Sequence, residues 1–204
     1  MSILLVRHGE TEGNRLRVLQ QPETPLSDRG KAQAQRLGER LAAQGVAAIL
    51  ASDYARARMT AEAVRSATGA PLELDAGLRE RNFGALRGRA YADLDVDPFA
   101  VGYSPPGGES WEELHARVDS VWERVARAVR DPESNLVVVT HGLVCHSLVT
   151  RHLQLAAGLD YAGGFANTAL TVIEPLPPWR VRVLGCTAHL DAATAHDPGS
   201  KSGL

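Results

Sequence analysis

The sequence contains little lysine and no excess of positive charge. Its 22 basic residues are 20 Arg and only two Lys, against 24 Asp and Glu, so the formal net charge at pH 7 is −2. Proteins that bind nucleic acid usually carry a clear basic excess that neutralises phosphates. The balance therefore argues against nucleic acid as a partner. Arginine suits the paired oxygens of phosphate or carboxylate, but a GC-rich coding bias would give the same excess over lysine.

Cysteine and long apolar runs are also scarce. Cys145 and Cys186 are the only two cysteines and form no Cys-x-x-Cys pair, which favours reduced thiols over a disulfide framework. No run approaches the roughly 18 apolar residues of a membrane span. The first residues lack the basic region and longer apolar stretch that make up a signal peptide. We therefore expect a cytoplasmic protein without membrane partners.

The 204 residues suit one domain, and strand-like and helix-like segments alternate along them. This order predicts an α/β fold, a three-layer sandwich with a central, mostly parallel sheet and helices on both faces. The expected strands cover residues 3–6, 47–51, 135–140, 170–174 and 181–184. The expected helices cover residues 27–44, 54–67, 143–155 and a segment from 110 that stops before Asp131-Pro132. We expect the domain to span residues 1–188, followed by a loose tail over 189–204.

Local signals mark the ends of two of these helices. Ser27 is a typical N-cap, and Gly45 is placed to end the helix that follows it. Ser110-Trp111-Glu112-Glu113 has the spacing of a capping box. The helix that it opens has one apolar face, made up of Trp111, Leu114, Val118, Val121, Trp122, Val125 and Val129.

The segment over residues 78–109 is rich in glycine, contains Pro105-Pro106 and has no clear periodicity. A long irregular segment inside a compact domain is usually functional or mobile. We expect residues 83–109 to form a lid over a site. Its aromatic residues either line a pocket or pack the lid down: Tyr91, Phe99 and Tyr103.

Two histidines follow expected strands directly. His8 stands after the first strand and His141 after the valine-rich strand, and each is followed by glycine. Ligands of open α/β sheets bind beyond the carboxyl ends of the strands. Glycine lets the backbone approach a ligand closely and leaves N–H groups that can face an anion. Either histidine alone is also compatible with a solvated loop residue. The occurrence of two histidines in equivalent positions favours a ligand-binding site.

Together these two segments resemble the histidine phosphatase superfamily, which includes cofactor-dependent phosphoglycerate mutases and related phosphatases. The resemblance extends from Leu5 to about Ile173. It rests on motifs that occur in the family's order: Arg7-His8-Gly9-Glu10-Thr11, Asn14, Pro25-Leu26-Ser27-Asp28-Arg29-Gly30, Ser52-Asp53-Tyr54-Ala55-Arg56-Ala57-Arg58-Met59-Thr60-Ala61, Leu78-Arg79-Glu80, Gly107-Gly108-Glu109-Ser110 and Thr140-His141-Gly142.

The resemblance implies that His8 is the nucleophile that accepts a phosphoryl group. It gives Arg7, Arg56 and His141 the task of holding the phosphoryl oxygens, and Glu80 the role of proton donor.

Further phosphate contacts are implied for the Asn14 side chain and the Gly142 backbone N–H. Arg58 lies close to Arg56, but the family's Ser-x-x-x-Arg-Ala spacing falls on Arg56. Arg58 is therefore expected near the site or on the surface.

Phosphoryl transfer needs a nucleophile held in line and positive charge around the equatorial oxygens. A neutral imidazole, with an ordinary pKa of about 6.5, can attack if a backbone carbonyl fixes its other ring nitrogen. Guanidinium groups would hold the phosphate and disfavour protonation of His8. A buried Glu80 with a raised pKa would protonate the leaving group and then activate water. Neither step needs a metal, and no cofactor is expected.

Three other interpretations remain open for individual residues. Glu80 could be an exposed acidic residue that makes ordinary surface pairs with Arg79 and Arg81. His141, Cys145 and His146 could hold zinc, but no further ligands occur at usable spacing. Cys145 fits a small buried residue instead, and His146 and His152 fit ordinary helix residues.

Three functions remain compatible with the sequence. We favour a phosphomonoesterase, a hydrolase of the histidine acid phosphatase type, because the segment from Glu80 to Trp111 is short and its Pro105-to-Ser110 stretch resembles the phosphatase branch. A cofactor-dependent phosphoglycerate mutase, the second candidate, would use the same His8. A non-catalytic phosphate-binding or scaffolding module is the third candidate.

The expected partner is a small phosphorylated metabolite. Sugar phosphates, phosphoglycerates, nucleotide-type phosphates and α-ribazole phosphate all remain open as substrates. Monomer and homodimer are both compatible with the sequence.

Overall fold

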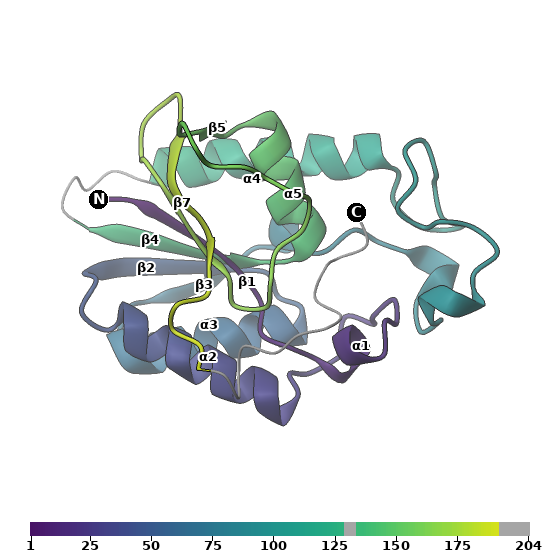
Figure 1. Cartoon of the computed structure of the whole chain (residues 1–204), viewed down its shortest axis with the longest axis horizontal. Coiled ribbons are helices and arrows are strands. Elements are labelled where there is room, and N and C mark those ends of the chain that lie inside the picture. The colour runs from purple at the N-terminus through teal and green to yellow at the C-terminus, as the bar shows by residue number, and fades with distance from the viewer. Residues whose placement is uncertain (129–133, 192–204) are drawn as a thin grey trace.

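A seven-stranded sheet forms the centre of the molecule (Figure 1). This computed structural model describes residues 1–128 and 134–191. The strand order is β3-β2-β4-β1-β6-β7-β5. The strands are β1 (Ile3–Arg7), β2 (Val46–Ala51), β3 (Leu72–Leu74), β4 (Asn135–Thr140), β5 (Gln154–Leu155), β6 (Leu170–Ile173) and β7 (Arg180–Cys186). Only β6 runs antiparallel to its neighbours β1 and β7, so the sheet is mostly parallel, as expected.

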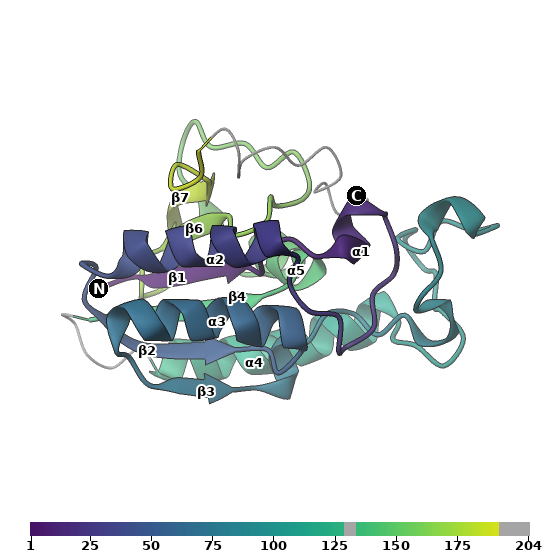
Figure 2. The ribbon, with the colours of Figure 1, turned by 90° about the horizontal axis from the view of Figure 1, so that it is seen from below.

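Helices cover both faces of the sheet (Figure 2). α2 (Asp28–Leu41) and α3 (Ala55–Thr68) lie side by side on one face, and α4 (Trp111–Ala128) and α5 (Gly142–Arg151) lie on the other. Alternate side chains of a strand point to opposite faces. In β1, Leu4 and Val6 belong to the core beneath α2 and α3, and Ile3 and Leu5 belong to the core beneath α4 and α5. The α/β sandwich is therefore confirmed.

Side-chain caps begin two of the helices, as the sequence predicts. Ser27 Oγ accepts a hydrogen bond from the backbone N–H of Gly30 at the start of α2. At the start of α4, the Glu113 N–H donates to Ser110 Oγ, and the Ser110 N–H donates to the Glu113 carboxylate. Val129 and the expected stop before Asp131-Pro132 lie outside the described residues.

Two helices are shorter than the sequence predicts. The expected helix over 143–155 was too long: α5 ends at Arg151, because Gln154 and Leu155 pair with Arg180 and Val181 as a short parallel strand. The expected helix over 27–44 ends at Leu41, ahead of the turn that leads into β2. β3 and a single helical turn, α1 (Glu12–Arg15), were not expected.

The segment over residues 83–109, which the sequence predicts to be a lid and which is called the lid below, is irregular but anchored. It includes short 3₁₀ turns at Gly84–Leu86 and Tyr91–Asp93, and it buries Phe83 and Phe99. Beneath it lies Arg81, which is 1% exposed.

The Arg81 guanidinium donates hydrogen bonds to the backbone carbonyls of Pro98, Tyr103 and Glu109. Its guanidinium carbon lies 4.8 Å from the centre of the Trp111 ring. This one buried side chain therefore holds three points of the lid, in addition to the backbone hydrogen bonds that join Gly88 and Tyr91 to Leu19 and Arg17.

The last described residues make contacts with the domain. His189 lies 3.1 Å from Arg40 through Nδ1 and 3.1 Å from the Thr168 hydroxyl through Nε2. The rest of the expected tail, 192–204, lies outside the described residues. Both cysteines are free thiols. None of the helices in the described parts of the chain is long and apolar enough to cross a membrane.

Candidate active site

Two neighbouring parallel strands bring the two His-Gly segments together. β1 pairs with β4 so that Arg7 lies opposite Thr140, the last residue of each strand. A histidine directly follows each of these strands: His8 follows β1 and His141 follows β4. The His8 N–H donates to the Thr140 carbonyl at 2.9 Å. The ring centres of His8 and His141 lie 5.1 Å apart. The candidate site thus lies at the carboxyl edge of the sheet, where α/β folds bind ligands.

The backbone fixes the orientation of the His8 ring. Its Nδ1 lies 2.7 Å from the carbonyl oxygen of Gly9, and since a carbonyl only accepts, Nδ1 carries the proton. Nε2 is therefore the unprotonated nitrogen, and it accepts a hydrogen bond from Arg56 Nε at 3.2 Å. Burial, followed by the charges of Arg56 and Arg7, holds the His8 pKa well below its ordinary value. The ring is neutral at neutral pH.

His141 is oriented by a hydroxyl group. Its Nε2 lies 2.8 Å from Ser52 Oγ, and the same oxygen accepts the N–H of Tyr54 at 3.2 Å. A serine hydroxyl both donates and accepts, so this contact fixes the orientation of the His141 ring through Nε2 and leaves Nδ1 as its other ring nitrogen. This Nδ1 is buried and has no hydrogen-bond partner among the described residues. Burial holds the His141 pKa well below its ordinary value, with smaller contributions from Arg56 and His8.

Two buried arginines flank His8. Arg7 and Arg56 are each 3% exposed, and each donates to a backbone carbonyl, that of Phe165 and that of Gln21. Burial lowers the pKa of Arg56 to about 10, so it remains charged at neutral pH. Two guanidinium charges beside a neutral imidazole make this edge of the sheet strongly positive.

Glu80 reaches the same place from the segment that precedes the lid. Its carboxylate accepts the N–H of Arg81 at 3.0 Å and the N–H of Leu143 at 3.3 Å. Burial raises the pKa of this carboxyl. Arg79 pairs with Asp53 instead, and Arg81 is buried under the lid. The structure therefore does not place Glu80 in ordinary surface pairs with its two neighbours.

The side chains converge on a small inner cavity. Its volume is about 50 Å³. Its lining includes six of the seven residues implied as site residues: Arg7, His8, Asn14, Arg56, Glu80 and Gly142. The seventh, His141, is fully buried, and its ring centre lies 5.1 Å from that of His8 in this lining. Tyr91 and Phe99 line the cavity from the lid, whereas Tyr103 packs against the core.

Asn14 and Gly142 present donors to the cavity. Asn14 caps α1 together with Thr11, and its Oδ1 accepts from the Thr11 N–H at 3.1 Å and from Asn167 Nδ2 at 3.4 Å. Its own Nδ2 is thus the part of the amide available to an anion. Gly142 is the first residue of α5, where backbone N–H groups have no partner within the helix.

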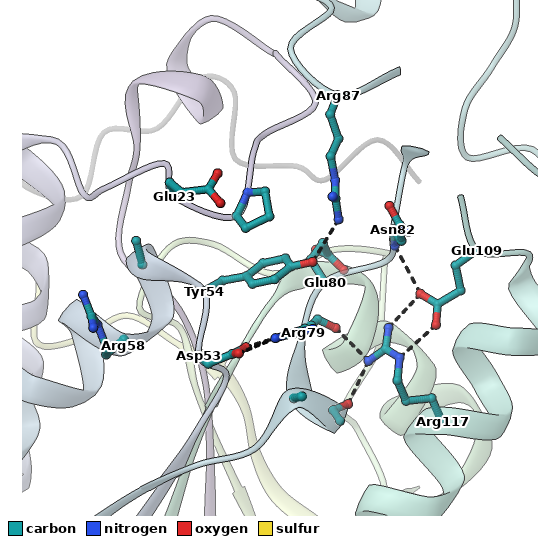
Figure 3. Close-up of a pocket in the computed structure, with 14 residues that line it drawn as sticks. Glu23, Asp53, Tyr54, Arg58, Arg79, Glu80, Asn82, Arg87, Glu109 and Arg117 are labelled. Atoms are coloured by element: carbon teal, nitrogen blue, oxygen red, sulfur yellow. Dashed lines mark hydrogen bonds and ion pairs between the residues drawn. The ribbon is translucent and has the colours of Figure 1, made fainter. Parts of the chain in front are cut away.

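A second, larger space lies next to the inner cavity. This outer cleft has a volume of about 900 Å³, and Tyr54 and Glu80 line both spaces (Figure 3). Arg58 lines the cleft, not the cavity, and is exposed. This placement matches the expectation that Arg58 lies at the surface.

Three residues without an implied role support the site. Asn167 donates from Nδ2 to the His8 carbonyl at 3.0 Å. Thr60 Oγ1 accepts the Gly9 N–H at 3.0 Å and donates to the Arg56 carbonyl at 2.8 Å. The third is Ser52. Ser52 and Thr60 belong to one of the family motifs, and Ser52 follows a strand as the two histidines do, but no sequence signal marks Asn167.

Gly9 and Gly30 allow the chain that follows β1 to approach the start of α2 closely. A Cβ atom on Gly30 would lie 1.9 Å from the Glu10 carbonyl oxygen, and one on Gly9 would lie 2.6 Å from the Gly30 oxygen. The Glu10 carboxylate accepts from Ser27 Oγ at 2.9 Å and pairs with Arg29 at 3.1 Å. The segment from Pro25 to Gly30 therefore holds the chain just after His8.

The residues considered for zinc have separate partners. His141 binds Ser52, and His146 Nδ1 lies 3.0 Å from the Tyr161 hydroxyl. Cys145 is buried, and burial raises its pKa. Within residues 1–128 and 134–191, no three His, Cys, Asp or Glu side chains are grouped as a metal site requires.

Comparisons with known proteins agree with this geometry. The sequence profile of the histidine phosphatase superfamily (branch 1) matches residues 3–178. The chain is 32% identical to the "Probable phosphoglycerate mutase GpmB" of Citrobacter koseri, over 94% of this chain and 96% of that protein.

Solved structures of similar proteins include phosphatases. A mycobacterial glucosyl-3-phosphoglycerate phosphatase in complex with VO3 has a TM-score of 0.76 and 29% identity, covering 91% of this chain and 99% of its own. YhfR of Bacillus stearothermophilus has a TM-score of 0.78 and 29% identity, covering 93% and 99%. With its two His-Gly segments at the carboxyl edge of the sheet, the chain belongs to the histidine phosphatase superfamily.

Proposed function

We propose that this enzyme hydrolyses phosphate monoesters of small metabolites through a phosphohistidine on Nε2 of His8. The observation that carries the proposal is the neutral His8 ring, whose Nδ1 proton is directed to the Gly9 carbonyl and whose Nε2 lone pair lies beside Arg56. A nucleophile of this kind needs no base to activate it.

The first step transfers the phosphoryl group to the enzyme. Its oxygens accept hydrogen bonds from Arg7, Arg56, Asn14 Nδ2 and the Gly142 N–H. The proposal also takes His141 in its Nδ1-protonated form, so that this otherwise unpartnered nitrogen donates to the same oxygens. The Nε2 lone pair attacks phosphorus, and the bond from phosphorus to the leaving oxygen breaks. Glu80, protonated through its raised pKa, gives its proton to that oxygen. The positive charge of the buried guanidinium groups offsets the charge on the transferring oxygens.

The second step returns the enzyme to its starting state. Glu80 is now a carboxylate and takes a proton from a water molecule that attacks phosphorus. The bond from phosphorus to Nε2 breaks, which releases inorganic phosphate and restores the neutral ring of His8. No step calls for a metal ion, because the arginines supply the positive charge.

Phosphoglycerate mutase activity is the second candidate, favoured by the name of the Citrobacter koseri relative. A mutase would use the same first step but would pass the phosphoryl group from His8 to a glycerate rather than to water. The names of the solved structures include a phosphatase. The fate of the phosphoryl group, and not the geometry of His8, distinguishes the two.

Hydrolysis of p-nitrophenyl phosphate by the purified protein, with and without EDTA and orthovanadate, tests the proposal. We expect turnover that resists EDTA, inhibition by vanadate and complete loss of turnover in His8→Ala. His146→Ala, which changes a histidine outside the cavity, is the matched control. Full activity in His8→Ala, or its loss with EDTA, would overturn the mechanism.

Phosphorus NMR with 3-phosphoglycerate separates the two candidates. Accumulation of inorganic phosphate supports the phosphatase, whereas appearance of 2-phosphoglycerate supports the mutase. Binding of phosphate without either product would leave the non-catalytic module as the remaining interpretation.

A further inference from the structure

The outer cleft has room for the alcohol part of a substrate. It begins at Tyr54 and Glu80, the two side chains that it shares with the inner cavity (Figure 3). In the proposed mechanism Glu80 protonates the leaving oxygen, so the carbon skeleton attached to that oxygen extends into this cleft. The side chains that line the cleft therefore contact the leaving group.

Four arginines line the cleft, and two of them are neutralised by carboxylates. Arg79 donates to both oxygens of Asp53, and Arg117 donates to both oxygens of Glu109 (Figure 3). Paired side chains of this kind have little attraction left for a ligand. Their charges therefore do not select the leaving group.

The other two arginines differ in their surroundings. Arg58 is exposed and lies 3.7 Å from Glu62 on α3. Arg87 is partly buried, and its Nη2 donates to the Tyr54 hydroxyl at 2.9 Å. Within the described residues the Tyr54 hydroxyl is the only hydrogen-bond partner of the Arg87 guanidinium, whose carbon also lies 6.0 Å from the centre of the Tyr54 ring, and no carboxylate of these residues lies within ion-pair distance of it. Arg87 is thus a cation that lines the cleft without an ion-pair partner among the described residues.

The backbone on either side of Arg87 is held in place. The N–H of Ala85 donates to the Pro106 carbonyl at 2.9 Å, and the N–H of Gly88 donates to the Leu19 carbonyl at 2.6 Å. Leu86 between them is buried. The guanidinium is therefore positioned before a ligand binds, which reduces the entropic cost of binding.

We infer that Arg87 binds a second anionic group, a carboxylate or a phosphate, on the leaving group. The favoured substrates are then phosphate monoesters of alcohols that carry another negative charge. This inference rests on the proposed function, since it takes the cleft as the site of the leaving group. In Figure 3 Arg87 points toward Tyr54 and Glu80, so the second anion would lie close to the ester oxygen.

Matched substrate pairs test the inference. 3-Phosphoglycerate and glycerol 3-phosphate differ only by a carboxylate in place of a hydroxymethyl group. Propane-1,3-diol bisphosphate and its monophosphate differ only by the second phosphate. We expect kcat/KM to favour the more acidic member of at least one pair by about tenfold or more, the contribution of one charge-assisted hydrogen bond. The pair with the larger ratio identifies the anion.

Variants of Arg87 assign the preference to its side chain. Arg87→Gln should reduce the preferred ratio about tenfold, and Arg87→Lys should retain part of it. Arg36→Gln, which removes an exposed charge from α2, should leave the ratio unchanged. A ratio near one in the native enzyme, or a full ratio in Arg87→Gln, would overturn the inference.

Hydrolysis of p-nitrophenyl phosphate in every variant separates this inference from the proposed function. If the native enzyme hydrolyses it but shows no preference within either pair, only the role of Arg87 is wrong. If the native enzyme hydrolyses no phosphate ester, the proposed function is wrong and the role of Arg87 falls with it.

Discussion

The inner cavity and the outer cleft hold their charged side chains in different ways. Beside the cavity, Arg7 and Arg56 are almost completely buried and donate to backbone carbonyls and to a neutral histidine. In the cleft, Arg79 donates instead to the carboxylate of Asp53, and the two side chains form a partly exposed ion pair. Charges interact more strongly in a buried, low-dielectric site than at the surface. Under the proposed function, the cavity would therefore bind one anion strongly, and contacts in the cleft would be weaker.

In the proposed function the cavity carries the chemical steps, and the cleft sets the specificity for the leaving group. Every phosphate monoester presents the same phosphoryl group to the cavity, whereas leaving groups differ in size and charge. Exposed ion pairs contribute roughly 0–1 kcal/mol, so substitutions in the cleft change little else in the protein. Substitutions around the cavity would instead leave buried charges or carbonyls without partners. We expect the size of a mutational effect to fall from the cavity to the cleft.

The largest effect is expected at Glu80, on the boundary between the two spaces. Glu80→Gln removes the proton donor, and kcat/KM on an alkyl phosphate should fall about 10²- to 10⁴-fold. The kcat/KM of p-nitrophenyl phosphate, which reports the first step alone, should fall much less, because nitrophenolate leaves without protonation; kcat falls on both substrates, since Glu80 also activates water in the second step. Steady-state kinetics on both substrates measures the difference. Glu62→Gln, an exposed carboxylate of α3, is the control, and equal losses of kcat/KM on both substrates would contradict the assignment.

The pH dependence of the same variant adds a second measurement. Glu80 acts in its protonated form and His8 in its neutral form. The pKa of Glu80 is raised and that of His8 is lowered. Activity should therefore fall as pH rises through the pKa of Glu80, and it should fall on the acid side only well below pH 6.5. The alkaline limb should disappear in Glu80→Gln.

A large effect on stability is expected from Arg81, whose guanidinium donates to three backbone carbonyls of the lid. Arg81→Met keeps the length of the side chain but leaves three backbone carbonyls without their donor. An unsatisfied buried group costs about 1–3 kcal/mol, so the free energy of unfolding should drop by roughly 3 kcal/mol or more. Urea denaturation measures it. Arg89→Met, on an exposed residue of the same lid, should change stability by less than about 1 kcal/mol.

A smaller effect on kcat is expected from Ser52. Ser52→Ala removes the hydroxyl that lies 2.8 Å from Nε2 of His141, so the ring loses the contact that fixes its orientation. We expect kcat to fall about tenfold, with a lesser change in KM. Ser66→Ala, on α3, is the control. An unchanged kcat would show that His141 keeps its orientation without Ser52.

The smallest effect is expected from the pair in the cleft. Arg79→Gln and Asp53→Asn should each change kcat/KM and stability by less than about 1 kcal/mol, within about fivefold. A double-mutant cycle measures their coupling. A coupling well above 1 kcal/mol would contradict the comparison, because it would mean that charges in the cleft interact as strongly as charges in the buried cavity.

The sequence predicts the sheet and the two histidines for a simple physical reason. β1 and β4 are buried on both faces, so they are continuous apolar runs, and each histidine follows its run directly. The orientation of His141 could not be predicted, because Ser52 comes from a third strand and only the sheet order brings it near. Asn167 lies before β6, in a segment without any motif.

Tertiary contacts also explain the errors. The apolar residues Leu153 and Leu155 continue the helical pattern of α5, but pairing with β7 draws this segment into a strand. Arg81 has the appearance of a surface residue in the sequence, since arginine is seldom buried. Only the folded lid supplies the three carbonyls and the aromatic ring that surround it.

His8 is held by segments that lie far apart in the sequence. Asn167 and Thr168 donate to the His8 carbonyl, and Ala169 accepts the Arg7 N–H. Domains are synthesised from the amino terminus, so a growing chain exposes His8 early but lacks these contacts until residue 169 has left the ribosome. The geometry on which the proposed function rests therefore forms only after nearly all of the domain has been made.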